Sequence, residues 1–356
     1  GYSACAVTDH GTISGAVSFT QACKNKNIKP ILGCEFYLSA QSATIQSTEN
    51  RSLSHLCVLA KNKAGWNQLI KAVSRSNDED IFYHKPRLDL DLLGEFVDGN
   101  LIGFSGHLGS DLANVIFESP RAAYRASTEE EVKKYIASDW DSRALELANR
   151  YADIFGKENF FIEIQCIDEE NSPASRLVAQ GLRYIAKKHG FKSVATADSH
   201  YVEKQDAIDH TILLCSAMKT PLRQLKSKIE KNIEVGFSGF MKSNNFHIPS
   251  FEEIQSLHRS HEIQATHEIE SMCEEYDILS KPMLPQFKCP EEISEEQYLR
   301  HLCREGWKNI LKPLGKISTQ TQSDIYAERI KKELEVISNA HLSGYFLIVR
   351  DIVQRV

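Results

Sequence analysis

The stretch Ala4-Cys-Ala-Val-Thr-Asp-His10 is an apolar run of strand length that ends on a carboxylate and a histidine. A second apolar run, Pro30–Cys34, leads into Glu35 in the same way, and the amphipathic segment Gly15–Lys26 lies between the two runs. A strand, a helix and a second strand form the repeating unit of a parallel α/β sheet. The opening of the chain therefore predicts an α/β fold whose strands end on polar side chains.

The alternation of short apolar runs and longer amphipathic segments continues along the first three quarters of the chain. Four more strands are expected, at Leu56–Ala60, Leu101–Phe104, Phe160–Gln165 and Ser193–Thr196. Helices are expected at Gly65–Arg75, Glu129–Ile154, Ser172–His189, Gln205–Leu214, Ser250–Arg259 and Glu262–Tyr276. This pattern indicates parallel βα units.

A proline-rich stretch then interrupts the pattern. Three prolines fall within Lys281–Pro290, and proline does not continue a helix. Beyond it three helices are expected, with Ser294–Leu311 and Ile325–His341 the clearest. The predicted organisation is a first domain over residues 1–278, a linker over 279–290 and the beginning of a second domain over 291–356.

The composition is that of an ordinary globular protein, since 42% of the 356 residues are hydrophobic and 25% are charged. No apolar run approaches the roughly 18 residues that a membrane helix needs, so no membrane association is expected. A net charge of −6 excludes a protein whose whole surface binds phosphate groups, although it is compatible with a local basic groove. No two of the nine cysteines are spaced as CxxC, which favours reduced thiols and a cytoplasmic location.

Both ends of the sequence have the character of cuts in a longer chain. There is no initiating methionine, and Gly1–His10 is not a signal peptide because it enters a strand without a basic start. At the other end, Tyr345–Val356 stops inside an apolar, helix-like pattern that has no cap. We therefore expect a fragment of a longer protein.

Four of the expected strands carry a carboxylate, a histidine or both at or near their carboxyl ends. The residues concerned are His10, Glu35, His107, Asp198 and His200. Carboxyl ends of parallel strands meet at one rim, where α/β barrels build their active sites. His55 begins the run Leu56–Ala60 instead of ending it, so it fits only if that strand runs differently or the preceding loop folds over the rim.

Histidine and carboxylate side chains at one rim are suitable ligands for zinc, manganese or iron. Four histidines and two carboxylates exceed what one tetrahedral zinc uses, which favours two or more metals that share bridging carboxylates. Such a cluster positions a phosphate ester and lowers the pKa of a bound water toward neutrality. The alternative is that each histidine is a hydrogen-bonded structural residue; recurrence at four strand ends argues against it, because unpaired buried charges are costly.

The ordered set of motifs resembles the polymerase and histidinol phosphatase (PHP) family, in the form that opens C-family bacterial replicative DNA polymerases. The motifs of the first domain are Val7–Phe19, Ile28–Tyr37, His55–Asn62, Gly65–Leu69, Lys85–Asp89, Leu101–Gly109 and Val194–Tyr201. Two later stretches, Glu328–Ile337 and Ser343–Asp351, resemble the start of the polymerase palm. The resemblance covers nearly the whole chain and is weakest over Lys219–Asn245.

The resemblance implies a set of metal ligands, residue by residue. They are His10, Glu35, His55, His107, Asp198 and His200. Asp9 is expected to support the ligand His10 without contacting the metal itself. At the position of His107 the family has either Cys or His. The family's first ligands, a His-x-His pair and a nearby acidic residue, precede the Thr-Asp-His motif, and its catalytic polymerase aspartates follow the Tyr345–Val349 segment. Both are expected outside this sequence.

The implied fold is a distorted (β/α)7-type PHP barrel followed by the helical start of a palm domain. The resemblance implies that the chain is a fragment of a DNA-directed DNA polymerase, a nucleotidyltransferase that acts in DNA replication. It also implies that the PHP domain has metal-dependent 3′–5′ exonuclease capacity in the intact protein. Zinc, manganese or iron is the implied PHP metal, and magnesium that of the polymerase site. The implied partners are primer-template DNA, deoxynucleoside triphosphates and other replisome subunits such as the sliding clamp and the proofreading subunit.

Two alternatives come from other classes of protein. One is a free-standing PHP phosphoesterase that acts on a small ester such as histidinol phosphate; such an enzyme has no need for the palm-like stretch Glu328–Asp351. The other is a non-catalytic PHP scaffold. Six retained ligand positions argue against a scaffold, although a metal can also be purely structural.

Overall fold

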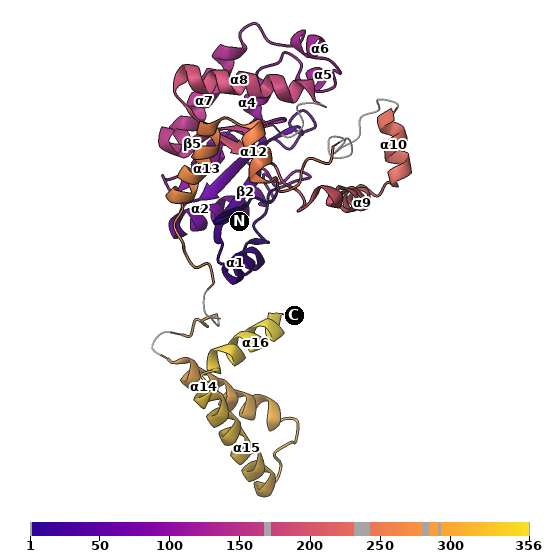
Figure 1. The fold of residues 1–356 in the computed structure, drawn as a ribbon. Coiled ribbons are helices and arrows are strands. Elements are labelled where there is room, and N and C mark those ends of the chain that lie inside the picture. Colours follow the sequence, from indigo (N-terminus) through magenta and orange to yellow (C-terminus); the bar gives the residue numbers. More distant parts are fainter. Residues whose placement is uncertain (1, 167–171, 231–242, 280–284, 291–292, 356) are drawn as a thin grey trace. The chain divides into compact units, whose positions relative to one another are not determined.

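The computed structural model describes residues 2–166, 172–230, 243–279, 285–290 and 293–355 (Figure 1). The chain divides into two compact units, Gly1–Ile278 and Leu279–Val356. The strands of the first unit are β1 (Ala4–Val7), β2 (Lys29–Ser39), β3 (Leu53–Ala60), β4 (Leu101–Phe104), β5 (Phe160–Gln165) and β6 (Lys192–Thr196). Each of them lies where the apolar runs of the sequence predict a strand.

Helices connect these strands and follow the last one. They are α1 (Ala16–Asn25), α2 (Lys63–Ser76), α3 (Leu90–Gly94), α4 (Asp111–Asn114), α5 (Pro120–Ala123), α6 (Glu129–Lys133), α7 (Trp140–Phe155), α8 (Pro173–His189), α9 (Ala207–Ala217), α10 (Leu222–Glu230), α12 (Phe251–Leu257) and α13 (Ser260–Met272). The ends of α8 show how local sequence sets a boundary. The Ser172 hydroxyl accepts a hydrogen bond from the Ser175 N–H at the start, and Gly190 takes the left-handed conformation at the end.

The six strands form one sheet in the order β1-β2-β3-β4-β5-β6. The outer pairs β1/β2, β4/β5 and β5/β6 are parallel, as expected, whereas β2/β3 and β3/β4 are antiparallel. The expectation of parallel βα units throughout is therefore wrong for the centre of the sheet. The connection from β2 to β3, over residues 40–52, contains no helix, and a parallel return needs a longer crossover.

Side chains alternate between the two faces of the sheet, and each face has its own hydrophobic core. On one face, Leu32, Val58 and Ile162 pack with residues of α2, α7 and α8. On the other face, one residue or more from every strand joins a cluster with α13. The members of that cluster are Ala4, Ile31, Cys57, Leu59, Ile102, Phe104, Phe161, Val194, Ala265, Ile269, Met272 and Cys273.

A single hydrophobic cluster that includes α13 and residues of all six strands indicates a sheet that curls toward this helix. In the described part of the chain no strand pairs β1 with β6, so the sheet is an open, curled one with helices on both faces. The α/β class and the curled PHP-type sheet agree with the fold that the sequence implied.

The prediction of a single helix over Glu129–Ile154 is wrong, because the chain forms two helices, α6 and α7, with a break at residues 134–139. In the break, Ile136 pairs with Phe117 as an isolated β-bridge, and the Ala137 N–H donates to the Ile116 carbonyl. These non-local hydrogen bonds replace the local ones that a continuous helix would make. Periodicity alone does not reveal such a competition.

The second unit consists of three helices, α14 (Glu295–Gly306), α15 (Gln320–Asn339) and α16 (Ser343–Arg355), as the sequence predicts. A π-helical turn, Trp307–Leu311, extends α14. The α16 backbone approaches α14 closely at Gly344, where a Cβ would lie 2.6 Å from the Glu295 carboxylate. Among the described residues, no helix of either unit has the combination of length and apolarity that spanning a bilayer requires.

A buried ion pair joins α8 to α13 on the first unit. The Arg183 guanidinium donates from Nε and Nη2 to the two carboxylate oxygens of Glu262, at 2.7 and 2.8 Å. Glu262 is fully buried. Burial alone would raise the pKa of this carboxyl, but the Arg183 guanidinium, the His258 ring and the Arg259 backbone N–H hold the pKa well below its usual range. The carboxylate is therefore charged and depends on its partner.

We expect Arg183→Met to lower the free energy of unfolding by about 3 kcal/mol, because it removes the cation bonded to both oxygens of the buried Glu262 carboxylate and leaves only His258 and the Arg259 N–H beside it. The exposed pair Lys133–Glu129 on α6, at 2.6 Å, provides the control, and Lys133→Met should change stability little. The measurement is urea unfolding followed by circular dichroism. Equal losses for the two variants would contradict the prediction.

Candidate metal centre

The candidate centre lies on the face of the sheet that α13 covers, beyond the end of the apolar cluster. On β2 the residues of that face are Ile31, Gly33, Glu35 and Tyr37, so the face changes from apolar to polar along the strand. On β3, His55 lies opposite Tyr37 in the ladder. Because β3 is antiparallel to β2, its first residues meet the carboxyl end of β2, and this explains the position of His55 at the start of its strand.

The Glu35 carboxylate lies between two imidazole rings. Its Oε2 is 3.1 Å from His10 Nδ1 and its Oε1 is 3.0 Å from His55 Nδ1. Three possible ligand atoms, one from each residue, lie within 4.8 Å of one another. The backbone fixes His10 there, since the Glu35 N–H donates to the Asp9 carbonyl at 3.0 Å and the Gly11 N–H donates to the Glu35 carbonyl at 2.8 Å.

His200 and Asp198 approach this group from the end of β6. The His200 ring centre lies 5.9 Å from that of His10. His200 Nδ1 donates to the Asp198 carbonyl at 2.7 Å, so the lone pair of the neutral ring is on Nε2. Asp198 adopts a left-handed backbone conformation, with φ of 46°, which aspartate tolerates better than most residues. The turn after β6 thus delivers two polar side chains to the same rim.

The charge states of the group suit metal binding. Burial would raise the pKa of Glu35, but the hydrogen bond from His55 and the nearby His10 and His200 outweigh it and hold that pKa below its usual value. Burial, together with the neighbouring His55 and His200, lowers the pKa of His10 in spite of Glu35. An ionised carboxylate beside a neutral imidazole is the form in which these groups bind a metal.

Asp198 differs from Glu35 in the direction of its pKa shift. Burial raises the pKa of Asp198, and the Glu35 charge acts in the same direction, whereas His200 and His55 oppose it. Two carboxylates of one rim therefore have pKa values shifted in opposite directions. A cation bound between them would favour the ionised form of both.

The structure does not bring His107 into the group formed by His10, Glu35 and His55 among the described residues. His107 is buried after β4, where its Nε2 lies 3.2 Å from the Ser175 hydroxyl on α8. Burial, with smaller contributions from Arg183 and His258, lowers the pKa of His107 to about 3. The ring is therefore neutral, and its role as a ligand stays a prediction.

Asp9 supports the centre mainly through its backbone. Its carbonyl accepts the Glu35 N–H, while its carboxylate lies against Gly15, where a Cβ would be 2.9 Å from Oδ2. The side chain is thus directed at the residue before α1. The expected support of His10 by Asp9 stays a prediction.

Glu163, in the middle of β5, is a residue of this face that sequence reasoning missed. Its Oε1 accepts hydrogen bonds from the Thr196 hydroxyl at 2.6 Å and from Gln165 Nε2 at 2.8 Å. Burial raises the pKa of Glu163 to about 7 against these hydrogen bonds, and the charges of Glu35 and Asp198 add to the effect of burial. The available signal was an acidic residue inside an otherwise apolar strand.

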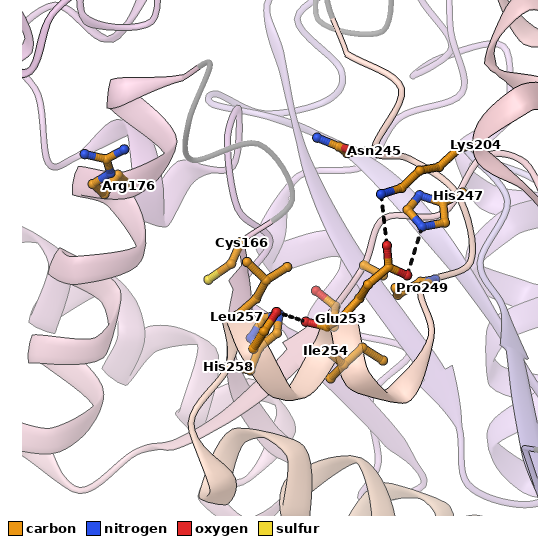
Figure 2. A pocket seen from close by; sticks show the side chains of 13 residues that line it. Cys166, Arg176, Lys204, Asn245, His247, Pro249, Glu253, Ile254, Leu257 and His258 are labelled. Atoms are coloured by element: carbon orange, nitrogen blue, oxygen red, sulfur yellow. Dashed lines mark hydrogen bonds and ion pairs between the residues drawn. The ribbon is translucent and has the colours of Figure 1, made fainter.

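A cavity of about 460 Å³ opens beside the carboxyl end of β6, where Thr196 and Ala197 line it (Figure 2). Its wall carries a paired set of charges, since Glu253 lies 2.9 Å from Lys204 Nζ and 3.2 Å from His247 Nε2. These contacts and the Ser250 N–H lower the pKa of Glu253 to about 2. Thr196 and Ala197 directly precede Asp198, so the cavity borders the turn that carries this residue, and within its wall Glu253 is paired with Lys204.

Comparison with known proteins first defines the class. Residues 1–166 match the family model of the PHP domain, and residues 297–356 match that of the bacterial DNA polymerase III alpha NTPase domain. The first unit is thus a PHP-type α/β domain that carries a candidate His/Glu metal site.

Curated relatives then identify the kind of chain. The DNA polymerase III subunit alpha of Treponema pallidum is 32% identical over 99% of this chain and 27% of its own length. That of Aquifex aeolicus is 30% identical over 99% of this chain and 28% of its own length. The chain is a PHP-containing relative of bacterial DNA polymerase III alpha subunits, and it spans little more than a quarter of the length of these relatives. The resemblance stated from the motifs is confirmed.

In metal-free protein we expect Glu163 to make stability depend on pH. A folded-state pKa of about 7 against an ordinary value of 4.5 means that the folded chain holds a proton that the unfolded chain releases. Stability should therefore fall as the pH rises through this window, by about 3 kcal/mol.

Glu163→Gln should remove this pH dependence. The difference in the free energy of unfolding, variant minus wild type, should therefore be more positive at pH 8 than at pH 4.5. The test is denaturant unfolding at a series of pH values in the presence of a chelator. The same substitution at the exposed Glu146 on α7 is the matched control. A stability difference between wild type and Glu163→Gln that does not change with pH would refute the assignment.

Proposed function

We propose that this chain is the PHP-containing portion of a bacterial replicative DNA polymerase alpha subunit, and that its first unit binds divalent metal and hydrolyses phosphodiesters at the 3′ end of DNA. The observation that carries the proposal is the Glu35 carboxylate held about 3 Å from both His10 and His55 at the rim of a PHP-type sheet. His200 and Asp198 complete the set from β6, and His107 is a further proposed ligand.

Nitrogen ligands from histidine and oxygen ligands from carboxylates suit zinc, manganese or iron. When bound, such a metal supplies positive charge for a phosphate oxygen and lowers the pKa of a bound water. The protein residues have distinct tasks around it. Glu35 keeps two imidazoles in fixed orientations, and the His200 tautomer is set by the Asp198 carbonyl.

The polymerase part of the proposal concerns the second unit and the whole protein. We propose that residues 279–290 link the PHP domain to the beginning of the palm over residues 291–356, where the match at 297–356 supports the assignment. The polymerase activity, with its magnesium, primer-template DNA, deoxynucleoside triphosphates, sliding clamp and proofreading subunit, belongs to the whole protein by this proposal. The same match disfavours a free-standing phosphoesterase, and a replicative role is consistent with a cytoplasmic protein.

We expect His10→Ala and His55→Ala each to reduce zinc or manganese uptake by at least tenfold in affinity, because each removes a ligand. His261→Ala, at an exposed position at the start of α13, is the matched control and should bind metal as the wild type does. The measurement is metal content after dialysis, with titration calorimetry for affinity. Unchanged affinity in both His10 and His55 variants would overturn the site.

In the intact protein, nucleotide release from a 3′-labelled single strand should require zinc or manganese and stop with a chelator. Glu35→Gln should lower that rate by at least about 100-fold, because metal positioning supplies several kcal/mol of transition-state stabilisation. Primer extension by the same variant is the control and should be unaffected. If the intact protein shows metal binding but no chelator-sensitive release, the PHP domain is a scaffold.

A further inference from the structure

A loop that precedes α3 packs directly on the candidate metal centre. Pro86 lies so close to Gly11 that a Cβ on Gly11 would be 2.8 Å from Pro86 Cγ, and Gly11 directly follows His10. The next residues run along β2, since the Leu88 N–H donates to the Tyr37 carbonyl at 3.0 Å and the Leu88 carbonyl accepts the Ser39 N–H at 2.8 Å. This contact fixes the segment just beyond Glu35 on β2.

Arg87 anchors the loop from within the protein. Its side chain is 1% exposed, and its guanidinium donates to backbone carbonyls at 2.8–2.9 Å. The acceptors are the carbonyls of Ile81, Asn50, Ala43 and Ile45. Because a guanidinium presents its donors in a rigid plane, these bonds fix the loop as well as satisfy the charge.

This loop places the Lys85 ammonium beside the histidines. Lys85 Nζ lies 4.1 Å from the centre of the Tyr37 ring, in cation–π geometry. The same ring stacks on His10, with centres 5.8 Å apart and planes 15° apart, and meets His55 edge-on at 5.2 Å. Tyr37 thus connects the lysine to two proposed ligands, and the Lys85 charge contributes, after burial, to lowering the pKa of His10.

Lys85 forms no ion pair with any carboxylate among the described residues. Lys204, in the wall of the neighbouring cavity, is by contrast paired with Glu253. The rim therefore carries an exposed cation beside an aromatic ring, and no carboxylate in the described part of the chain neutralises it. An anion bound at the centre would fill that role.

We propose that Lys85 is a substrate-binding residue, which donates from its ammonium group to a non-bridging oxygen of the DNA phosphodiester positioned at the metal centre. The proposal rests on the proposed phosphodiesterase function. Lys85 keeps its proton throughout; it forms no covalent bond and contributes charge and position. Tyr37 and Arg87 are positioning residues, because they hold the lysine without reaching the substrate.

The test uses the full chain loaded with manganese, and a short single-stranded DNA with a free 3′ hydroxyl as the probe. Lys85→Ala should weaken DNA binding by about tenfold, the loss expected for one charge-assisted hydrogen bond. It should also reduce the slope of log K against log salt by about 0.7, the contribution of one phosphate contact to a single strand. Lys85→Arg should retain the wild-type slope.

Two measurements separate this from other effects. Lys71→Ala, at an exposed lysine on α2, is the matched control and should bind DNA as the wild type does. Manganese content should be unchanged in Lys85→Ala, because the lysine is not a ligand. Inorganic phosphate is then titrated into the same proteins. Lys85→Ala should bind it more weakly than the wild type, and Lys71→Ala should bind it as the wild type does.

A Lys85→Ala protein that holds its manganese and binds DNA with wild-type affinity and slope would overturn the proposal. Failure of the proposed function has a different signature, namely that His10→Ala leaves manganese uptake unchanged. Even then, a reduced salt slope in Lys85→Ala supports the phosphate contact, and an unchanged slope rejects it.

Discussion

The structure around the rim depends on one carboxylate, that of Glu35, and on its two imidazole neighbours. A half-buried carboxylate loses hydration, and that loss must be offset by hydrogen bonds or opposite charge. His10 and His55 each place a ring nitrogen about 3 Å from this carboxylate, from two segments that flank β2 on opposite sides. One side chain therefore fixes the relative positions of the end of β1, the middle of β2 and the start of β3.

The division of one sheet face into an apolar and a polar part is the second constraint. The helix α13 covers the apolar part, where every strand contributes to a common cluster. Beyond this cluster, the same face presents Glu35 on β2, His55 on β3 and Glu163 on β5. Because side chains alternate with a period of two, a slip of one residue in β2 or β5 would place a carboxyl group in the opposite core. Folding and the geometry of the centre thus depend on the same register.

Much of this was predictable from the sequence, and the exceptions have physical causes. The strands and most helices follow from apolar spacing, and the rule that strands end on polar residues selected His10 and Asp198, which follow β1 and β6, and also Glu35, which the structure places in the middle of β2. That rule could not place His55, because its strand direction depends on a connection without a helix. It could not detect Glu163, which lies inside a strand and not at its end.

His107 shows a different limit of sequence reasoning. Its position after β4 obeys the strand-end pattern, but its ring contacts Ser175 on α8, a residue 68 positions away in the chain. A pattern in one strand contains no information about which helix will pack over its end. The break between α6 and α7 has the same origin, since Ile136 pairs with a residue outside the predicted helix.

The anchoring of the loop by Arg87 has a consequence for how the rim responds to its surroundings. Burial lowers the pKa of Arg87, yet a guanidinium stays protonated throughout the range in which proteins fold. All four of its acceptors are carbonyl oxygens, which do not titrate either. The loop that Arg87 anchors beside the centre therefore keeps its shape while the histidines and carboxylates of the centre gain and lose protons. Acidification would change the charge of this rim while leaving the conformation of that loop intact.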